Sequence, residues 1–384
     1  ASNLILLWTL WRAGKTAILI NTRLPKAVST QQLKFLNSAR LNNAATILYT
    51  SGSSASPKAV VHTYENHYYS ALGSQANIPL KVNDRWLLSL PLYHVSGLSI
   101  LFRCCLAGAT VIIPSADKTL IQNIRDHKVT HLSLVSAQLY RLLHDKKNIP
   151  VLRRLKAILL GGGPVPAELI QTALKYKLPI YLTYGLTETA SQVATSNAKD
   201  LKAKKLFTVR ILPYRQVKFA ADGEVFVKGK ILSPGYVMDK GIKKATDEHG
   251  WFATGDIGEK ISADQFVILG RKDNMFISGG ENIYPEEIER CLIGHPSIQQ
   301  AVAVPQPDRE FGMRPVALCK FCEGTKVSEE MLRKFLMQNL PDYKIPIGFY
   351  RITDKAGKDD GNSKINRRAL SAFWRAHPEK FKKI

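Results

Sequence analysis

A loop rich in hydroxyl groups and glycine, ending in a lysine, stands near residue 50. Its sequence is Tyr49-Thr50-Ser51-Gly52-Ser53-Ser54-Ala55-Ser56-Pro57-Lys58, and it follows a strand-like apolar run. Exposed backbone N–H groups, hydroxyls and an ammonium are the groups that bind a polyphosphate. The spacing is not that of a Walker A loop, which needs G-x-x-x-x-G-K-[ST]. The segment predicts a phosphate-binding loop of another kind, with an ordinary Ser/Gly turn as the alternative.

A second segment sets a carboxylate between hydroxyls, in Tyr184-Gly185-Leu186-Thr187-Glu188-Thr189, directly after an expected strand. Such a group can hold Mg²⁺ together with a phosphate oxygen. The competing interpretation is a helix N-terminus, in which Thr187 is the cap and Glu188 interacts favourably with the helix dipole. Upstream, Gly161-Gly162-Gly163 follows another expected strand and would let a flat adenine approach the backbone.

Three later motifs combine charged side chains with glycine. In Thr254-Gly255-Asp256 and Gly270-Arg271-Lys272-Asp273, a carboxylate could accept hydrogen bonds from both ribose hydroxyls and an arginine could assist. Either segment could equally be a turn. Ser278-Gly279-Gly280-Glu281 is a glycine turn before an expected helix. Gly361-Asn362-Ser363-Lys364 carries a lysine on a glycine-bearing loop, where surface solvation is the ordinary interpretation.

The order of these motifs resembles the motif series of the adenylate-forming acyl-CoA synthetase superfamily, with agreement from residue 46 to residue 370. Within that superfamily, residues 61–64, 90–103, 133–143 and 364–370 look like the o-succinylbenzoate–CoA ligases of menaquinone synthesis. The resemblance implies that ATP and a carboxylic acid first give an acyl-adenylate and pyrophosphate. The acyl group then passes to the thiol of coenzyme A.

The resemblance also implies a role for each matching residue. Those expected to bind ATP or AMP are Thr50, Ser51, Gly52, Ser53, Ser54, Lys58, Gly161, Gly162, Gly163, Tyr184, Gly185, Thr187, Asp256 and Arg271. Glu188 would bind Mg²⁺, and Thr187 would contact the α-phosphate. Lys364 would stabilise the pentavalent transition state from a lid that swings about Asp273. Gly279 and Gly280 would then line the channel for coenzyme A.

The acid implied by the resemblance has two carboxylates, of which one must react and the other must be anchored. Arg103 and Arg141 are candidate anchors, because a guanidinium binds a carboxylate through two hydrogen bonds. Arg141 could equally lie on a helix surface. His94 and Ser96 are candidate contacts near the acyl group, and we count His94 among the catalytic residues. The alternative for His94 is a packed core histidine.

Two features depart from the family pattern. Ala55 stands where the family usually has glycine, which removes easy access to positive φ, so a left-handed position there would be strained and would weaken nucleotide binding. Residues 4–25 resemble a helix and strand that family members reach only after several dozen residues. We therefore expect a shortened front, which would affect stability more than chemistry because every nucleotide motif lies downstream.

The elements that must position these motifs read as an α/β fold. Strand-like runs alternate with helical stretches over the first 200 residues, which predicts layers of sheet and helix. The expected strands are 17–21, 46–49, 86–89, 110–113, 131–134, 157–160 and 180–184. The expected helices are a buried one over 4–13, then 118–126, 137–143 and 167–175. Short strands separated by Gly, Pro and Asp predict a β-rich subdomain over residues 209–269.

The pattern changes again at the Gly270-Arg271-Lys272-Asp273 motif. We predict a large multi-subdomain N-terminal domain over residues 1–270 and a smaller, mobile α+β lid over residues 271–384. The lid is expected to contain an amphipathic helix over 285–292, a strand over 300–304 and a helix over 328–339.

Composition narrows the partners. The net charge is +23, from 54 Lys and Arg against 31 Asp and Glu, which favours anionic partners. Zinc-finger spacing and RNA-binding aromatic signatures are lacking, so dedicated nucleic-acid binding is not expected. The apolar run 4–11 is well short of the ~20 residues of a membrane span. The sequence leaves open whether the chain forms a homo-oligomer.

The five cysteines form an odd set, and we recognise no secretory signal, which together predict a reducing cytoplasm. Cys319 and Cys322 have the spacing of half a zinc site, but they belong to the strand-like run 316–321. We therefore interpret this pair as structural.

Other functions compete with the ligase interpretation. One is a sister ligase for another aryl or fatty acid, and another is a module that loads a carrier protein, for which no attached carrier is present in the sequence. A third is a degenerate, non-catalytic binding protein, against which Glu188, Asp256, Arg271 and Lys364 argue. A basic nucleic-acid binder would be supported by salt-sensitive binding to DNA.

Overall fold

The computed structural model describes residues 2–21, 43–50, 58–163, 165–196, 201, 207–238, 241–322, 324–325, 327–352 and 367–384. Most of the predicted phosphate loop, Ser51 to Pro57, lies outside the described residues, and so does Lys364. Within the described ranges, no helix is long and apolar enough to cross a membrane.

An eleven-stranded sheet carries the nucleotide motifs, in the order β11-β12-β15-β16-β10-β9-β8-β7-β6-β4-β5. One half is parallel: β4 (Arg85–Leu87), β5 (Thr110–Ile112), β6 (His131–Leu134), β7 (Ala157–Leu160) and β8 (Ile180–Leu186). The helices of this half are α4 (Val95–Ala107), α5 (Leu120–Asp126), α6 (Ser136–His144), α7 (Ile149–Arg153) and α8 (Ala167–Lys175). Its strands are apolar because helices cover parallel sheets, and Leu132, Ile158 and Leu160 are fully buried.

The other half of the sheet is antiparallel, and apart from β9 its strands belong to the predicted β-rich stretch. It contains β9 (Ser191–Thr195), β10 (Val209–Ile211), β11 (Arg215–Phe219), β12 (Glu224–Gly229), β15 (Phe252–Lys260) and β16 (Gln265–Arg271). Two strands of the same stretch leave it for a second sheet, in the order β1-β2-β3-β13-β14. These are β13 (Gly235–Met238) and β14 (Gly241–Lys244), which join β1 (Ala17–Leu19), β2 (Ala44–Tyr49) and β3 (Ala59–Thr63).

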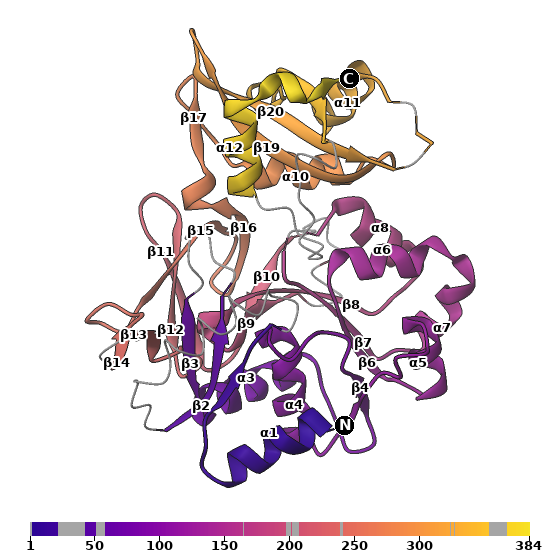
Figure 1. Ribbon diagram of the computed structural model, residues 1–384, viewed down its shortest axis with the longest axis vertical. Coiled ribbons are helices and arrows are strands. Elements are labelled where there is room, and N and C mark those ends of the chain that lie inside the picture. Colours follow the sequence, from indigo (N-terminus) through magenta and orange to yellow (C-terminus); the bar gives the residue numbers. More distant parts are fainter. Residues whose placement is uncertain are drawn as a thin grey trace.

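The C-terminal elements stand together at the top of Figure 1, in orange and yellow, around cores of their own. Strands β19 (Ile298–Asp308), β20 (Gly312–Phe321), β21 (Phe349–Arg351) and β22 (Lys382–Lys383) form one sheet, and β17 (Phe276–Ser278) pairs with β18 (Glu281–Ile283). The helices are α10 (Pro285–Ile293), α11 (Glu329–Met337) and α12 (Arg367–Ala376). The α/β class with a smaller α+β part is confirmed. The boundary between residues 270 and 271 stays a prediction.

The first helix departs from its prediction. α1 (Ser2–Arg12) forms, but only one side of it is buried, since Leu7 and Trp11 pack inside while Ile5 is 66% and Leu6 59% exposed. The Trp11 indole N–H donates to the Ala45 carbonyl at 3.0 Å, which ties α1 to β2. The expectation of a buried helix was wrong for the other side of α1, because the contacts with β1, β2 and α4 cover only the side that carries Leu7 and Trp11.

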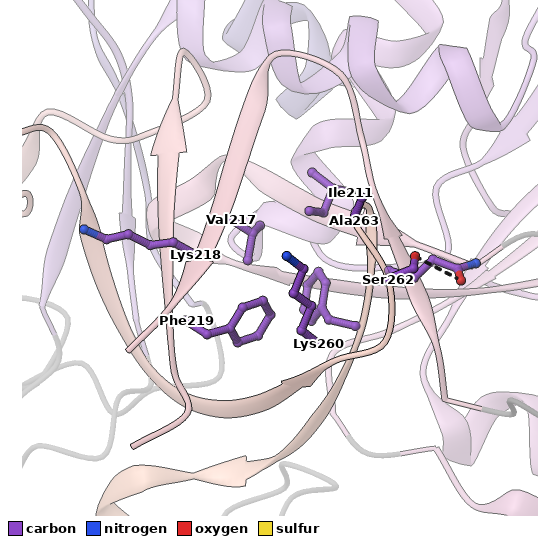
Figure 2. A pocket seen from close by; sticks show the side chains of 9 residues that line it. Ile211, Val217, Lys218, Phe219, Lys260, Ser262 and Ala263 are labelled. Carbon is purple, nitrogen blue, oxygen red and sulfur yellow. Dashed lines mark hydrogen bonds between the residues drawn. The ribbon is translucent and has the colours of Figure 1, made fainter. Parts of the chain in front are cut away.

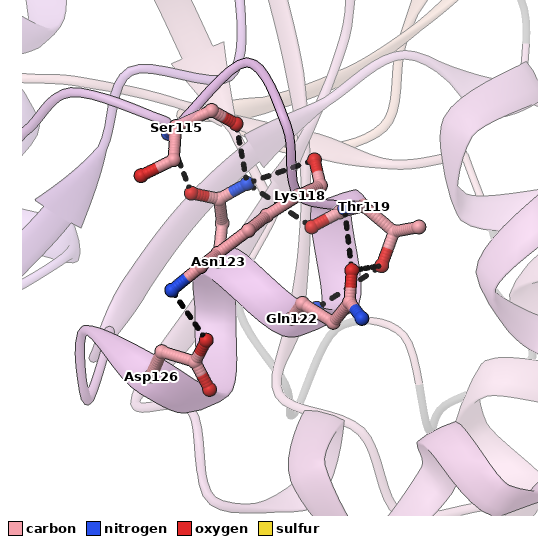
Figure 3. Close-up of polar contacts among 6 residues, drawn as sticks. All are labelled: Ser115, Lys118, Thr119, Gln122, Asn123 and Asp126. Atoms are coloured by element: carbon pink, nitrogen blue, oxygen red, sulfur yellow. Dashed lines mark hydrogen bonds and ion pairs between the residues drawn. The ribbon is translucent and has the colours of Figure 1, made fainter.

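Helix α5 begins at a hydrogen-bond network centred on Asn123, whose side chain is 1% exposed (Figure 3). Its amide nitrogen donates to the carbonyls of Ser115, Lys118 and Thr119 at 3.1–3.2 Å, and its amide oxygen accepts from the Ser115 N–H at 2.8 Å. Thr119 and Gln122 add a capping box. One side chain thus satisfies four backbone groups of the turn between β5 and α5.

We expect the Asn123→Ala variant to be destabilised by about 1–3 kcal/mol, because the Ser115 N–H and the Lys118 carbonyl lose the partner that the buried Asn123 side chain supplies. Urea unfolding followed by circular dichroism measures the change. The matched control is Lys118→Ala, which removes an exposed ion pair with Asp126 and should unfold like the wild type. Equal midpoints for Asn123→Ala and the control would contradict the importance given to this network.

Candidate active site

The two motifs predicted to bind ribose meet on adjacent strands. β15 and β16 pair with Asp256 opposite Arg271, and β8 brings Tyr184 to the same place. The Tyr184 hydroxyl donates to Asp256 Oδ2 at 2.7 Å, and Arg271 Nη1 donates to Asp256 Oδ1 at 3.1 Å and to the Thr254 carbonyl at 2.8 Å. Burial raises the pKa of Asp256, although Arg271 and Tyr184 oppose the change. Each carboxylate oxygen keeps a second lone pair with which it can accept a ligand hydroxyl.

A tight turn after β8 presents Thr187 and Glu188. Residues 187–189 form a 3₁₀ turn, and Ala190 and Ser191 follow with φ of 48° and 111°. Non-glycine residues at positive φ store strain of a kind that gathers at functional sites. A Cβ on Gly185 would lie 1.8 Å from the Ser191 carbonyl oxygen, so only glycine fits there.

The helix N-terminus considered for this segment was wrong. Leu186, not Thr187, occupies the position before the turn and makes no side-chain cap bond. The reason is the left-handed residue Ala190, which ends the turn after three residues and sends the chain back as β9, antiparallel to β8.

Glu188 has a neighbour that the sequence motifs did not indicate. The Tyr236 hydroxyl donates to Glu188 Oε1 at 3.0 Å, and the Lys58 ammonium lies 5.1 Å from the centroid of the Tyr236 ring. Burial and then the Glu188 charge raise the pKa of Tyr236, so the phenol remains a hydrogen-bond donor. No local motif marks this tyrosine. It reaches Glu188 and Lys58 because β13 pairs with β3.

The metal expected at Glu188 suits these groups. Among the described residues, no three His, Cys, Asp or Glu side chains gather as a metal cluster. Mg²⁺ commonly binds through one or two carboxylates plus substrate phosphates and keeps several waters. A single half-buried carboxylate, bonded to a tyrosine whose ring contacts a lysine ammonium, therefore fits a magnesium ion that arrives with a polyphosphate.

Two buried histidines lie next to the turn at Thr187, and one of them contacts its backbone. His62 Nε2 donates to the Thr187 carbonyl at 2.6 Å, and Thr46 Oγ1 lies 2.8 Å from His67 Nε2. The His67 ring stacks on Phe102 at 4.2 Å. Burial lowers the pKa of His62 to about 4, so its imidazole is neutral at neutral pH. His62 lies in the segment 61–64 that the sequence comparison singled out, but we gave it no role.

The His62→Gln variant should resist mild acid better than the wild type does. In the wild type, His62 has its ordinary pKa of 6.5 in the unfolded chain and a pKa of about 4 in the folded chain. Acid therefore protonates the unfolded chain first, and the free energy of unfolding falls as the pH drops from 6.5 towards 4. Between about pH 7.5 and about pH 5 this amounts to roughly 2 kcal/mol. Denaturant unfolding at both pH values should show a smaller loss in His62→Gln, while the exposed His249→Gln control loses as much as the wild type. An identical loss in His62→Gln would contradict the low pKa.

The four residues proposed for the acid lie in different surroundings. His94 directly precedes α4, and its ring centroid lies 4.7 Å from that of Tyr93. Because His94 is exposed, its interpretation as a packed core histidine was wrong. The Ser96 carbonyl accepts from the Ser99 hydroxyl at 3.1 Å. Arg141 is exposed on α6, as its helix-surface alternative predicted.

Arg103 is the buried member of this group, at 4% exposure. Its Nη2 donates to Ser191 Oγ at 3.1 Å, its guanidinium carbon lies 5.3 Å from the centroid of the Trp86 ring, and its Nε has no hydrogen-bond partner. Burial lowers the pKa of Arg103 to about 10. Within the described part of the chain, no carboxylate pairs with it. A buried guanidinium without a counter-charge is prepared for an anionic ligand.

The remaining candidates lie at turns. A Cβ on Gly161 would lie 2.5 Å from Thr183 Cγ2, and Gly162 has φ of 84°, so the chain passes close to β8 at the predicted adenine site. Gly279 and Gly280, at φ of 57° and 89°, make the turn between β17 and β18. Asp273 Oδ2 lies 3.6 Å from Arg271 Nη2, so the predicted hinge residue contacts the predicted ribose arginine.

The pocket drawn in Figure 2, about 280 Å³ in volume, lies apart from these groups. Ile211, Val217, Phe219 and Phe266 make its apolar wall, and none of the residues assigned to chemistry lines it. Phe266 belongs both to the pocket wall and to an edge-to-face contact with the Tyr184 ring, with 5.8 Å between the two ring centroids.

Two groups meet around the end of β8. The half-parallel sheet supplies Asp256, Arg271 and Tyr184, and the second sheet brings Tyr236 and Lys58 to Glu188. Together they indicate a nucleotide-dependent enzyme. Comparison with known proteins agrees with this class. The AMP-binding enzyme family matches residues 9–237, and the AMP-binding enzyme C-terminal domain matches residues 287–359. The chain belongs to the AMP-binding enzyme family.

Its relatives include the 2-succinylbenzoate–CoA ligase of Bacillus licheniformis, 35% identical over 371 residues, which are 94% of this chain and 76% of that protein. Among solved structures, o-succinylbenzoate CoA synthetase from Bacillus subtilis with its acyl-adenylate intermediate superposes with a TM-score of 0.81 at 30% identity, over 93% of this chain and 83% of the other. The same synthetase in complex with ATP and magnesium gives 0.79 at 29% identity, over 90% and 82%.

Proposed function

We propose that this chain is an AMP-forming acid–thiol ligase that converts o-succinylbenzoate to o-succinylbenzoyl-CoA, a step of menaquinone synthesis. ATP, Mg²⁺ and coenzyme A are the co-substrates and metal of the reaction. In the first half-reaction a substrate carboxylate oxygen attacks the α-phosphorus and pyrophosphate leaves. In the second, the coenzyme A thiol attacks the acyl carbon, loses its proton, and AMP leaves.

The observation that carries the proposal is the pair of groups around the end of β8. Asp256, with Arg271 and Tyr184, offers acceptors for the ribose hydroxyls. Glu188 and Lys58 offer a carboxylate for the metal and an ammonium for the phosphates. Bound Mg²⁺ would neutralise charge on the phosphate oxygens, so the protein acts mainly by positioning and electrostatic stabilisation.

The acid would bind with its unreactive carboxylate against Arg103, the buried guanidinium with no carboxylate partner among the described residues. His94 and Ser96 stand at the start of the same helix, α4, and would contact the acyl group. Arg141 is the second candidate anchor. Its exposed position on α6 supports it less than burial supports Arg103.

Residues 271–384 would act as the lid that delivers Lys364 in the first half-reaction and presents Gly279 and Gly280 to coenzyme A in the second. Support comes from Arg367, three residues after Lys364, which pairs with the buried Glu289 through two hydrogen bonds. Glu289 also accepts from the Ala303 N–H at 2.7 Å. This pair would anchor the chain at one end of the segment that contains the lysine.

We place the reaction in the cytoplasm, because all five cysteines are free thiols. The enzymatic test is to incubate the chain with ATP, Mg²⁺ and o-succinylbenzoate without coenzyme A and to look for the acyl-adenylate by mass spectrometry. The adenylate should accumulate and should disappear when coenzyme A is added. A folded chain that binds ATP and forms no adenylate would contradict the proposal.

A further inference from the structure

Tyr236 contacts both of the charged residues that the proposed function assigns to Mg·ATP. Its hydroxyl donates to Glu188 Oε1 at 3.0 Å, and the ammonium of Lys58 lies over its ring at 5.1 Å from the centroid. The two contacts use different parts of the tyrosine, the hydroxyl and the π face. Lys58 and Glu188 are 130 residues apart in sequence, and Tyr236 is a further 48 residues beyond Glu188.

The backbone around Tyr236 fixes this arrangement. Tyr236 pairs with Val60 on β3, two residues after Lys58. A Cβ on Gly235 would lie 2.0 Å from the Lys243 carbonyl oxygen, so β13 packs against β14 at a distance that only glycine allows. The N–H of Ser233 donates to the Glu188 carbonyl at 2.8 Å. The segment 233–236 therefore holds Glu188 by its backbone and by its side chain.

We propose that Tyr236 is a positioning residue for Mg·ATP, whose hydroxyl orients the Glu188 carboxylate and whose ring holds the Lys58 ammonium. This inference rests on the proposed function, since it takes Glu188 as the metal carboxylate and Lys58 as a phosphate ligand. Tyr236 itself touches neither metal nor nucleotide in this account.

The division of labour follows from the chemistry of each contact. A hydroxyl bond to Oε1 fixes the orientation of the carboxylate and leaves Oε2 available to a metal ion. A cation–π contact holds the ammonium without using any of its three N–H donors, so all three are available to phosphate oxygens. Both contacts hold the Glu188 and Lys58 side chains in place before Mg·ATP binds, so binding costs less side-chain entropy.

Two variants separate the two contacts. Tyr236→Phe removes the hydroxyl and keeps the ring, whereas Tyr236→Leu removes both. Calorimetric binding of a non-hydrolysable ATP analogue, measured across a Mg²⁺ titration and again in EDTA, reads the two effects without turnover. For Tyr236→Phe we expect the half-saturating Mg²⁺ concentration to rise about tenfold and binding in EDTA to be unchanged. For Tyr236→Leu, binding in EDTA should also weaken about threefold.

Control variants decide what a negative result means. Tyr68→Phe, on the exposed face of α3 (Tyr64–Asn77), should bind like the wild type, and thermal unfolding of every variant confirms that it is folded. Glu188→Gln should weaken the Mg²⁺-dependent binding of the ATP analogue. Lys58→Met should weaken its binding in EDTA. If these two bind like the wild type, the proposed nucleotide site is wrong. If they weaken binding while Tyr236→Phe keeps the wild-type Mg²⁺ dependence, the role given to Tyr236 alone is overturned.

Discussion

The Lys364→Ala variant is expected to form o-succinylbenzoyl-adenylate about 10²–10³ times more slowly than the wild type, because it would remove the charge that we propose stabilises the pentavalent transition state. Its KM for ATP should change little, since the contact is made in the transition state rather than the ground state. Single-turnover release of pyrophosphate measures the first half-reaction directly.

The second half-reaction supplies an internal control for this variant. Chemically prepared o-succinylbenzoyl-adenylate bypasses Lys364, so its conversion to the coenzyme A ester should proceed at close to the wild-type rate. The Lys382→Ala variant removes another exposed lysine of the C-terminal part and should behave like the wild type in both assays. Equal losses in both half-reactions would show that Lys364 supports the fold or the lid as a whole and not the adenylation step.

The Arg103→Met variant is expected to lose affinity for o-succinylbenzoate by about 2–5 kcal/mol, a factor of roughly 30 to several thousand in KM. The reason is that the guanidinium is buried, lacks a carboxylate partner among the described residues, and would supply the counter-charge for the unreactive carboxylate. Methionine keeps much of the volume. Because a buried uncompensated charge costs stability, the variant should melt at the wild-type temperature or above it.

The matched comparison is Arg141→Met, on the exposed face of α6. If Arg103 is the anchor, only its variant raises the KM for o-succinylbenzoate, and the KM for ATP is unchanged in both. A large effect at Arg141 with none at Arg103 would move the acid site to α6 and contradict the assignment made from burial.

Sequence patterns predicted the parts of the fold that local chemistry decides. The strands β6 and β7 are short runs between turn residues, and they form as expected because burial on both faces favours this mostly apolar composition. The residue types of Asp256 and Arg271 suggested a shared ribose site, which the family resemblance then favoured over two ordinary turns. Their contact depends on the register of β15 and β16, which contains a shift that spacing does not reveal.

The failures share one physical cause, since each depends on a neighbour distant in sequence. Tyr236 reaches Glu188 only because β13 leaves the β-rich stretch to pair with β3. His62 reaches the Thr187 carbonyl across 125 residues. The helix start that competed as the interpretation of Thr187 does not form, because Gly185 approaches Ser191 closely and the chain returns as a strand. α1 was expected to be buried because its apolar composition does not show that its neighbours cover only one of its sides.

The central claim is most directly tested by pyrophosphate release from Mg·ATP, measured in parallel with o-succinylbenzoate, benzoate and a medium-chain fatty acid. Release that requires o-succinylbenzoate, followed by formation of its coenzyme A ester when the thiol is added, is the result that we predict. Release with one of the other acids alone would keep the ligase chemistry and contradict the substrate. No release from a folded chain that binds ATP would contradict the catalytic claim itself.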